Sequence, residues 1–181
     1  MMRTMRFGGL LALSLGLASL TAVAQTCNPY VSAAAPNGRY TDPGDGTIVD
    51  TRTGLMWKKC SEGSNWDGTS GSCSGSAAKF SWSEALQRAN NVNVGSAGEK
   101  LGHNDWRLPN IKELASLVER KCYDPAVNAA FILNTQSDNY WSSSPFDTSS
   151  TAAWAIDFNS GIVNNGNQTN LRYMRLVRGG Q

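Results

Sequence analysis

The sequence has a single histidine, His103, among its 181 residues, and this scarcity limits the catalytic chemistry it can support. A serine or cysteine nucleophile needs a neighbouring base, and no serine lies in a Gly-x-Ser-x-Gly turn. The cysteines form no Cys-x-x-Cys pair, which disfavours a zinc site, and no glycine loop that would hold a phosphate is present. Paired carboxylates for glycoside hydrolysis remain open, because the fold sets their spacing.

Acidic residues are absent from positions 1–24, where Arg3 and Arg6 precede an apolar run from Phe7 to Ala18 and the small-residue triplet Ala22-Val23-Ala24. A basic start, an apolar stretch and an Ala-x-Ala site are typical of a secretory signal peptide. Its removal would leave 14 basic and 14 acidic side chains, a neutral protein. We therefore expect export to the periplasm or cell surface, no membrane span after cleavage, and no binding of nucleic acid through bulk charge.

All four cysteines follow the signal segment, and an even number in an exported chain predicts two disulfides with three possible connectivities. The segment between Cys60 and Cys73 is polar and rich in Gly and Ser, so a local cross-link would order it. Such a link contributes about 3 kcal/mol at this loop length. The composition therefore favours Cys60–Cys73, which leaves Cys27–Cys122.

The N-terminal half divides into a lead, a meander and a loop. Residues 25–38 form a lead with little periodicity, and we expect one domain over residues 39–181. Residues 39–57 alternate β-branched or apolar segments with Gly- and Asp-rich turns, which predicts a small antiparallel meander. Residues 61–79 form a Ser/Gly-rich loop.

Two helices are predicted in the middle of the chain. The first begins after Ser81, which matches a capping box with Glu84, and its apolar stripe fades near Asn90. The second begins after Asn110 and ends by Cys122. Both starts carry a capping side chain with a Glu three residues later, a strong local signal.

The last third reads as strands and turns, with segments 140–143, 153–158, 162–163 and 173–178. Strands and helices do not alternate, which excludes a doubly wound nucleotide-binding fold. The expected fold class is α+β, with two helices packed on one curled antiparallel sheet and cross-linked by disulfides.

Several ordered segments carry a resemblance to a known family: Asp45-Gly46-Thr47, Thr53-Gly54-Leu55-Met56-Trp57, Asp105-Trp106-Arg107-Leu108-Pro109, Tyr140-Trp141-Ser142-Ser143-Ser144 and Arg175-Leu176-Val177-Arg178. Together they resemble the bacterial Lcl C-terminal domain family over about residues 39–179. No single segment is decisive, but the ordered set is specific.

The resemblance implies a C-type-lectin-like fold, distantly similar to sulfatase-modifying (formylglycine-generating) proteins. It also implies an exported or surface protein, since the collagen-like protein that names the family is an adhesin that binds host polysaccharide. This chain has no Gly-x-y collagen segment, so that stalk is missing. The formylglycine-generating relatives bind copper through cysteines near the C-terminus. The last cysteine here is Cys122, so we do not expect that activity.

Trp66 is the candidate ligand-binding residue, because it lies in the polar loop between Asn65 and Asp67. A sugar ring can stack on an aromatic face that has hydrogen-bonding groups beside it. The alternative is that Trp66 folds back as a small core of its own loop, as tryptophan generally prefers burial.

Three carboxylates, Asp42, Asp45 and Asp50, surround a glycine turn and form the one candidate calcium site. Their spacing departs from an EF-hand loop, and Asp and Gly are also the usual residues of a hairpin turn. The motifs of lectins that bind sugars through calcium are not recognisable. We therefore favour a turn and expect no cofactor.

The Trp106-Arg107-Leu108-Pro109 segment is interpreted as structural. Trp106 would be buried, Pro109 would precede the second helix, and Arg107 would bind carbonyls or a carboxylate such as Asp157. A ligand-facing loop is the alternative.

The sequence therefore predicts an exported, non-catalytic binding module. Glycan or glycosaminoglycan recognition, or adhesion, is the favoured function, with the long loops as the recognition surface. A protein–protein interaction module of the bacterial envelope is one alternative, and an unrecognised hydrolase is another.

Overall fold

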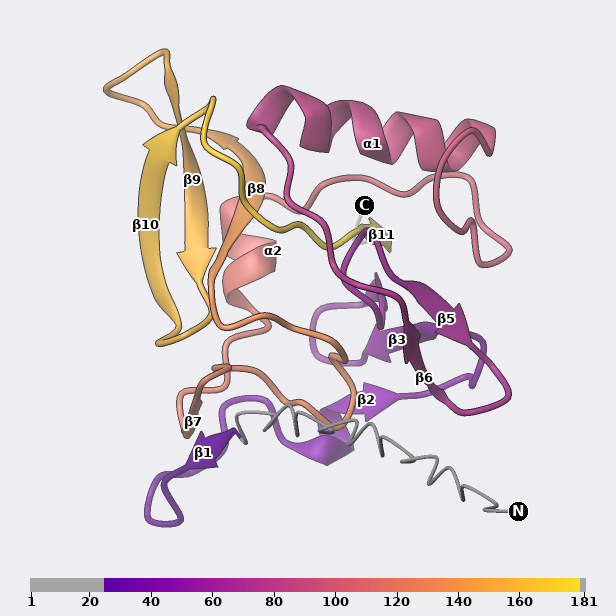
Figure 1. Ribbon diagram of the computed structural model, residues 1–181. Coiled ribbons are helices and arrows are strands. Elements are labelled where there is room, and N and C mark those ends of the chain that lie inside the picture. Colours follow the sequence, from indigo (N-terminus) through magenta and orange to yellow (C-terminus); the bar gives the residue numbers. More distant parts are fainter. Residues whose placement is uncertain (1–24, 180–181) are drawn as a thin grey trace, which may run out of the picture.

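The computed structural model describes residues 25–179, so the predicted signal segment, residues 1–24, lies outside the described residues. Within the described part the fold is α+β and mostly sheet, with two α-helices and four small antiparallel sheets (Figure 1). The elements in chain order are β1 Thr26–Cys27, the 3-10 turn η1 Asn37–Arg39, β2 Tyr40–Thr41, β3 Thr47–Asp50, β4 Leu55–Lys58, β5 Asn65–Asp67, β6 Ser72–Ser74, α1 Trp82–Val94, α2 Ile111–Ala115, β7 Cys122–Tyr123, β8 Asn139–Pro145, β9 Ala152–Asp157, β10 Ile162–Asn167 and β11 Val177–Gly179.

The four-stranded sheet joins the two ends of the domain. Its strand order is β11-β4-β3-β2, and the meander expected over residues 39–57 supplies three of these strands. The last strand, β11, pairs with β4, with Val177 opposite Trp57. The closing segment of the chain therefore completes the sheet that the first third begins.

The three-stranded sheet, β10-β9-β8, has a different core on each face because strand side chains alternate. Tyr140 and Ile156 pack in the cluster that contains Leu114 of α2. Their neighbours Trp141 and Ala155 pack in the second cluster, which holds the buried side chains of α1. The two helices thus contribute to two separate cores with β8 and β9 between them.

The first helix begins as predicted and runs further than predicted. Ser81 accepts a hydrogen bond from the Glu84 amide, and the Glu84 carboxylate accepts one from the Ser81 amide, so the capping box is confirmed. The helix continues past Asn90 to Val94 and ends at Gly95, which has a left-handed backbone.

The second helix is shorter than predicted. Its capping box at Asn110 and Glu113 is confirmed, but it ends at Ala115 and not near Cys122. Val118 forms a β-bridge with Val127, and the Glu119 amide donates to the Ala126 carbonyl. These contacts with a distant segment replace the next helical turn.

Two further expectations differ from the structure. The single curled sheet is wrong: the described strands form four sheets, and a register shift between Trp141 and Pro145 limits the pairing of β8. The loop 61–79 contains the β5–β6 hairpin, in which Trp66 is opposite Cys73.

Both disulfides have the pairing that the loop composition favoured. Cys60 is bonded to Cys73, and Cys27 is bonded to Cys122 within the β1–β7 pair. Over residues 25–179, no helix is both long enough and apolar enough to cross a membrane.

Candidate functional site

The β5–β6 hairpin presents Trp66 at the molecular surface. The Cys60–Cys73 disulfide ties the hairpin to the segment that follows β4, and Trp66 lies directly opposite the bonded Cys73. The indole is half-buried, so part of it remains open to solvent. The hairpin therefore carries an aromatic side chain on a covalently anchored support.

Contacts from three other segments orient Trp66. The Lys59 ammonium lies 4.4 Å from the ring centroid, a cation–π distance. The Trp66 amide donates to Glu99 Oε2 at 2.6 Å. Gly46 approaches so closely that a Cβ built there would lie 2.6 Å from Trp66 Cγ, and its φ of 90° also favours glycine. Trp66 is thus partly packed against these segments and partly exposed. It matches neither sequence-based alternative completely, the free stacking face or the core of its own loop.

The residues flanking Trp66 have different surroundings. Asp67 accepts hydrogen bonds from Ser70 Oγ and from the amides of Thr69 and Ser70, so it caps its own turn. The hydrogen bond from the Ser70 hydroxyl lowers the pKa of Asp67 most, and the bonds from the two amides lower it further. The side chain of Asn65 is exposed and makes no hydrogen bond to the other described residues. The Asn65 side chain is therefore free of described partners, but as the preceding residue of β5 it points to the opposite face of the hairpin from the indole.

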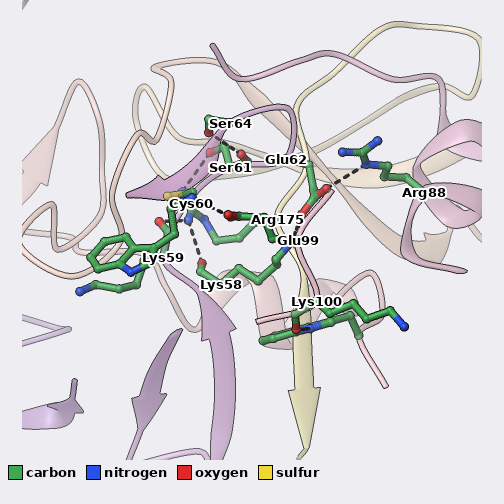
Figure 2. Close-up of polar contacts among 12 residues, drawn as sticks. Lys58, Lys59, Cys60, Ser61, Glu62, Ser64, Arg88, Glu99, Lys100 and Arg175 are labelled. Carbon is green, nitrogen blue, oxygen red and sulfur yellow. Dashed lines mark hydrogen bonds and ion pairs between the residues drawn. The ribbon is translucent and has the colours of Figure 1, made fainter. Parts of the chain in front are cut away.

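A buried network supports the base of the hairpin (Figure 2). Arg175 is fully buried and donates to the carbonyls of Lys58 and Lys59 and to Ser61 Oγ. It also donates to Leu133 O, at 2.7 Å. Burial lowers the pKa of Arg175 to about 10, which leaves it charged at neutral pH. The guanidinium therefore holds the backbone of residues 58–61 rigidly below the hairpin.

A second buried charge cluster lies beside Arg175. The Glu62 carboxylate is almost fully buried and accepts hydrogen bonds from Lys58 Nζ at 2.6 Å and Arg88 Nε at 2.9 Å (Figure 2). Arg88 belongs to α1, so this cluster links the helix to the segment between β4 and β5. Buried charges are tolerated only when paired and hydrogen-bonded, as they are here.

The three candidate calcium residues do not converge. Asp42 accepts a hydrogen bond from Lys59 Nζ at 2.6 Å, and Asp45 accepts from the amide and hydroxyl of Thr47. Asp50 is buried against Arg39. In the part of the chain that the structure describes, no group of three or more His, Cys, Asp or Glu side chains is placed to hold a metal ion.

Lys59 connects Asp42 to the tryptophan. Burial would raise the pKa of Asp42, but the hydrogen bonds from Lys59 and from the Gly44 amide outweigh it, so the pKa lies below its usual value. The carboxylate therefore stays ionised and holds the lysine in the position from which it contacts Trp66.

The Trp106–Pro109 segment makes internal contacts of the kind that its structural interpretation predicts. Trp106 is buried, and its indole Nε1 donates to Lys100 O at 2.7 Å. Arg107 forms a two-pronged pair with Glu113, both bonds 2.7 Å, and donates to the Gly179 carbonyl. The suggested partner Asp157 is wrong, because Glu113, one turn into α2, lies within reach of the guanidinium.

The sequence indicated Trp66 but not the residues that hold it. Lys59, Gly46 and Glu99 come from three separate segments, and no local pattern links them to the tryptophan. Gly46 was recognised as a turn glycine and as part of the Asp45-Gly46-Thr47 segment, but neither signal linked it to Trp66.

A family model described as the Lcl C-terminal domain matches residues 46–178. The match begins at the glycine that contacts Trp66 and extends into β11, so it includes the hairpin, both helices and the three-stranded sheet. It lies inside the domain expected over residues 39–181. No curated protein matches the chain at a significant level.

Proposed function

The chain belongs to the Lcl C-terminal domain family, and from this membership we propose that it is an exported, non-catalytic binding module with a C-type-lectin-like scaffold. The proposed ligand is a glycan or glycosaminoglycan. The disulfides support export, because such bonds persist in oxidising compartments. The likeness to a polysaccharide-binding adhesin supports the ligand class.

The half-exposed indole of Trp66 is the observation that carries the ligand proposal. Lys59 contacts the ring, Glu99 binds the backbone amide of Trp66, and the indole Nε1 makes no hydrogen bond to the other described residues. A sugar needs an aromatic face and nearby donors and acceptors. Because the base of the hairpin is rigid, binding would order few additional groups, which favours affinity.

Binding to an envelope protein is the second candidate function. On the edge strand β10, Ile162 and Val163 are exposed by 61% and 45%. Exposed apolar side chains on a sheet edge are typical of surfaces that bind other proteins. A pull-down from envelope extract that retains one defined protein, with no saccharide bound, would favour this function over the first.

Replacement of Trp66 by alanine tests the glycan proposal. Glycan arrays with the purified protein would identify the saccharide, and calorimetric titration would measure its affinity. We expect Trp66→Ala to bind at least about tenfold more weakly, because the stacking face is lost. Trp154, a half-buried tryptophan of β9, provides the matched control Trp154→Ala, which should bind as the parent does. Absence of saccharide binding by the parent, or equal binding by Trp66→Ala, would contradict the proposal.

A further inference from the structure

The turn at the end of β10 carries an acceptor pattern for the attachment of sugar to asparagine. Asn167, Gln168 and Thr169 form the one Asn-x-Ser/Thr triplet among the 181 residues, and its central residue is not proline. Such a triplet can accept a sugar only where the fold exposes it at the surface. Its position in the structure therefore decides whether it can be modified.

The structure exposes the two residues that the pattern requires and fixes the residue between them. Asn167 is the last residue of β10, and both Asn167 and Thr169 are exposed. The Gln168 amide donates to Thr151 O at 2.8 Å, and the Gln168 carbonyl accepts from the Trp82 amide at 2.9 Å. The central residue thus anchors the turn, while its two neighbours remain accessible.

Hydrogen bonds within the triplet orient the asparagine side chain. Asn167 Oδ1 accepts from the Thr169 amide at 3.0 Å and from the Thr169 hydroxyl at 2.8 Å. The Asn170 amide donates to the Asn167 carbonyl at 2.9 Å and closes the turn. Asn167 Nδ2 makes no hydrogen bond to the other described residues. The nitrogen that would receive a sugar is therefore the free atom of a side chain that is otherwise held in place.

The surface beside the triplet is uncharged and partly apolar. Residues 161–171 include no charged side chain. The next charged residue, Arg172, donates to Asn164 Oδ1 at 3.0 Å and to Asn165 O at 3.2 Å. Leu171, two residues after the triplet, is 61% exposed. A hydrophilic saccharide attached here would make this region more soluble.

The strand that ends at the triplet lacks the usual protection of a sheet edge. β10 lies at the edge of the β10-β9-β8 sheet, and its six residues include no charge and no proline. Edge strands are commonly protected by such residues from pairing with another chain. A bulky hydrophilic group on Asn167 would protect the end of β10 in another way. This observation is independent of the triplet and favours modification at the same place.

We propose that Asn167 is a site of N-linked glycosylation, with a sugar diphosphate as the class of donor. Asn167 Nδ2 attacks the anomeric carbon of the sugar and forms a C–N bond, while the bond from that carbon to the diphosphate oxygen breaks. The diphosphate leaves with the electron pair, and the nitrogen releases one proton to solvent. The modification does not depend on the glycan binding that we propose for Trp66.

Three variants separate a modified asparagine from one that only stabilises the turn. Asn167→Asp keeps the Oδ1 acceptor for both Thr169 donors and removes the nitrogen that would carry the sugar. Thr169→Ser keeps the hydroxyl of the acceptor pattern, and Thr169→Val replaces that hydroxyl with a methyl group. Because all four proteins keep the rest of the turn, differences in modification report on the triplet itself.

The test is tandem mass spectrometry of the full-length chain purified from its native cells. We expect the peptide that contains residues 167–169 to be heavier by one or more whole sugar residues in the parent and in Thr169→Ser, with the added mass on Asn167. The same peptide should have its unmodified mass in Asn167→Asp and in Thr169→Val. A native parent in which Asn167 is unmodified would overturn the inference. Added sugar that persists in Asn167→Asp or in Thr169→Val would also overturn it, because the triplet would then not be the acceptor.

A reconstitution identifies the source of the sugar diphosphate. The unmodified full-length parent, made in a host without such transferases, is incubated with native membranes or with native soluble extract and nucleotide sugars. Modification of Asn167 by the membranes alone would support a lipid-linked donor. Modification by the soluble extract would support a nucleotide-linked donor.

Discussion

At the scale of single residues, Arg39 and Asp50 form a buried ion pair in which each charge depends on the other. Asp50 is fully buried and Arg39 nearly so. Both guanidinium prongs donate to the carboxylate, which also accepts from Thr53 Oγ1 at 2.7 Å and from the Arg52 amide at 3.0 Å. These bonds join η1, the end of β3 and the β3–β4 turn. Removal of the carboxylate would leave a buried cation without a counter-charge.

Asp50→Asn should therefore reduce the free energy of unfolding by about 3–5 kcal/mol at pH 7, measured by urea denaturation. The effect should depend on pH. Burial raises the pKa of Asp50, but the hydrogen bonds from Arg39 and Thr53 outweigh it, so the folded-state pKa lies below the ordinary value of 3.8. The stabilisation is thus complete above pH 3.8 and is lost as the pH falls through the folded-state pKa.

The matched control is Asp45→Asn, an exposed turn carboxylate bonded to Thr47. Its loss should not exceed about 1 kcal/mol. A difference between parent and Asp50→Asn that stays constant from pH 7 to pH 2 would show that the charge of Asp50 is not what stabilises the fold.

At the scale of elements, local sequence signals predicted where the two helices begin. They did not predict features that depend on contacts with distant segments. The caps at Ser81 and Asn110 were predictable because each bond joins residues three apart. The end of α2 was not, since the bridge from Val118 to Val127 comes from another segment. The β5–β6 hairpin was missed because its strands lack apolar alternation, and the Cys60–Cys73 disulfide and the Asp67 turn hold it in place.

The same limit applies to the candidate sites. Trp66 could be proposed as a binding residue from the sequence because its polar neighbours adjoin it. Lys59 and Glu99, which orient it, were not, because only the fold brings them together.

The α1 capping box gives a prediction at this scale. Ser81→Ala removes the side-chain acceptor for the Glu84 amide, so the free energy of unfolding should fall by about 1 kcal/mol. Ser83→Ala changes the same residue type inside the first turn and should be neutral or slightly stabilising, because alanine favours the helix interior. Chemical denaturation of both variants measures the difference. A loss in Ser83→Ala that equals the loss in Ser81→Ala would contradict the capping role.

At the scale of the whole molecule, the two disulfides close chain segments of very different length. Cys60–Cys73 closes a separation of 13 residues and acts on one hairpin, whereas Cys27–Cys122 spans 95 residues. The longer link attaches the N-terminal lead to the segment after α2, within the β1–β7 pair (Figure 1). Noncovalent contacts add to it: the Gln25 amide donates to Pro125 O and Val127 O, both at 2.6 Å.

Because a longer closed loop removes more entropy from the unfolded chain, the long link should contribute more to global stability. We expect Cys27→Ser/Cys122→Ser to lose about 4–5 kcal/mol and Cys60→Ser/Cys73→Ser about 3 kcal/mol, measured by denaturation under oxidising conditions. Hydrogen exchange should separate local from global effects. The short-link variant should expose amides of β5 and β6 first, which would also weaken the glycan binding that we propose for Trp66. A larger loss from the short link would mean that the hairpin, and not the attachment of the lead, limits the stability of the molecule.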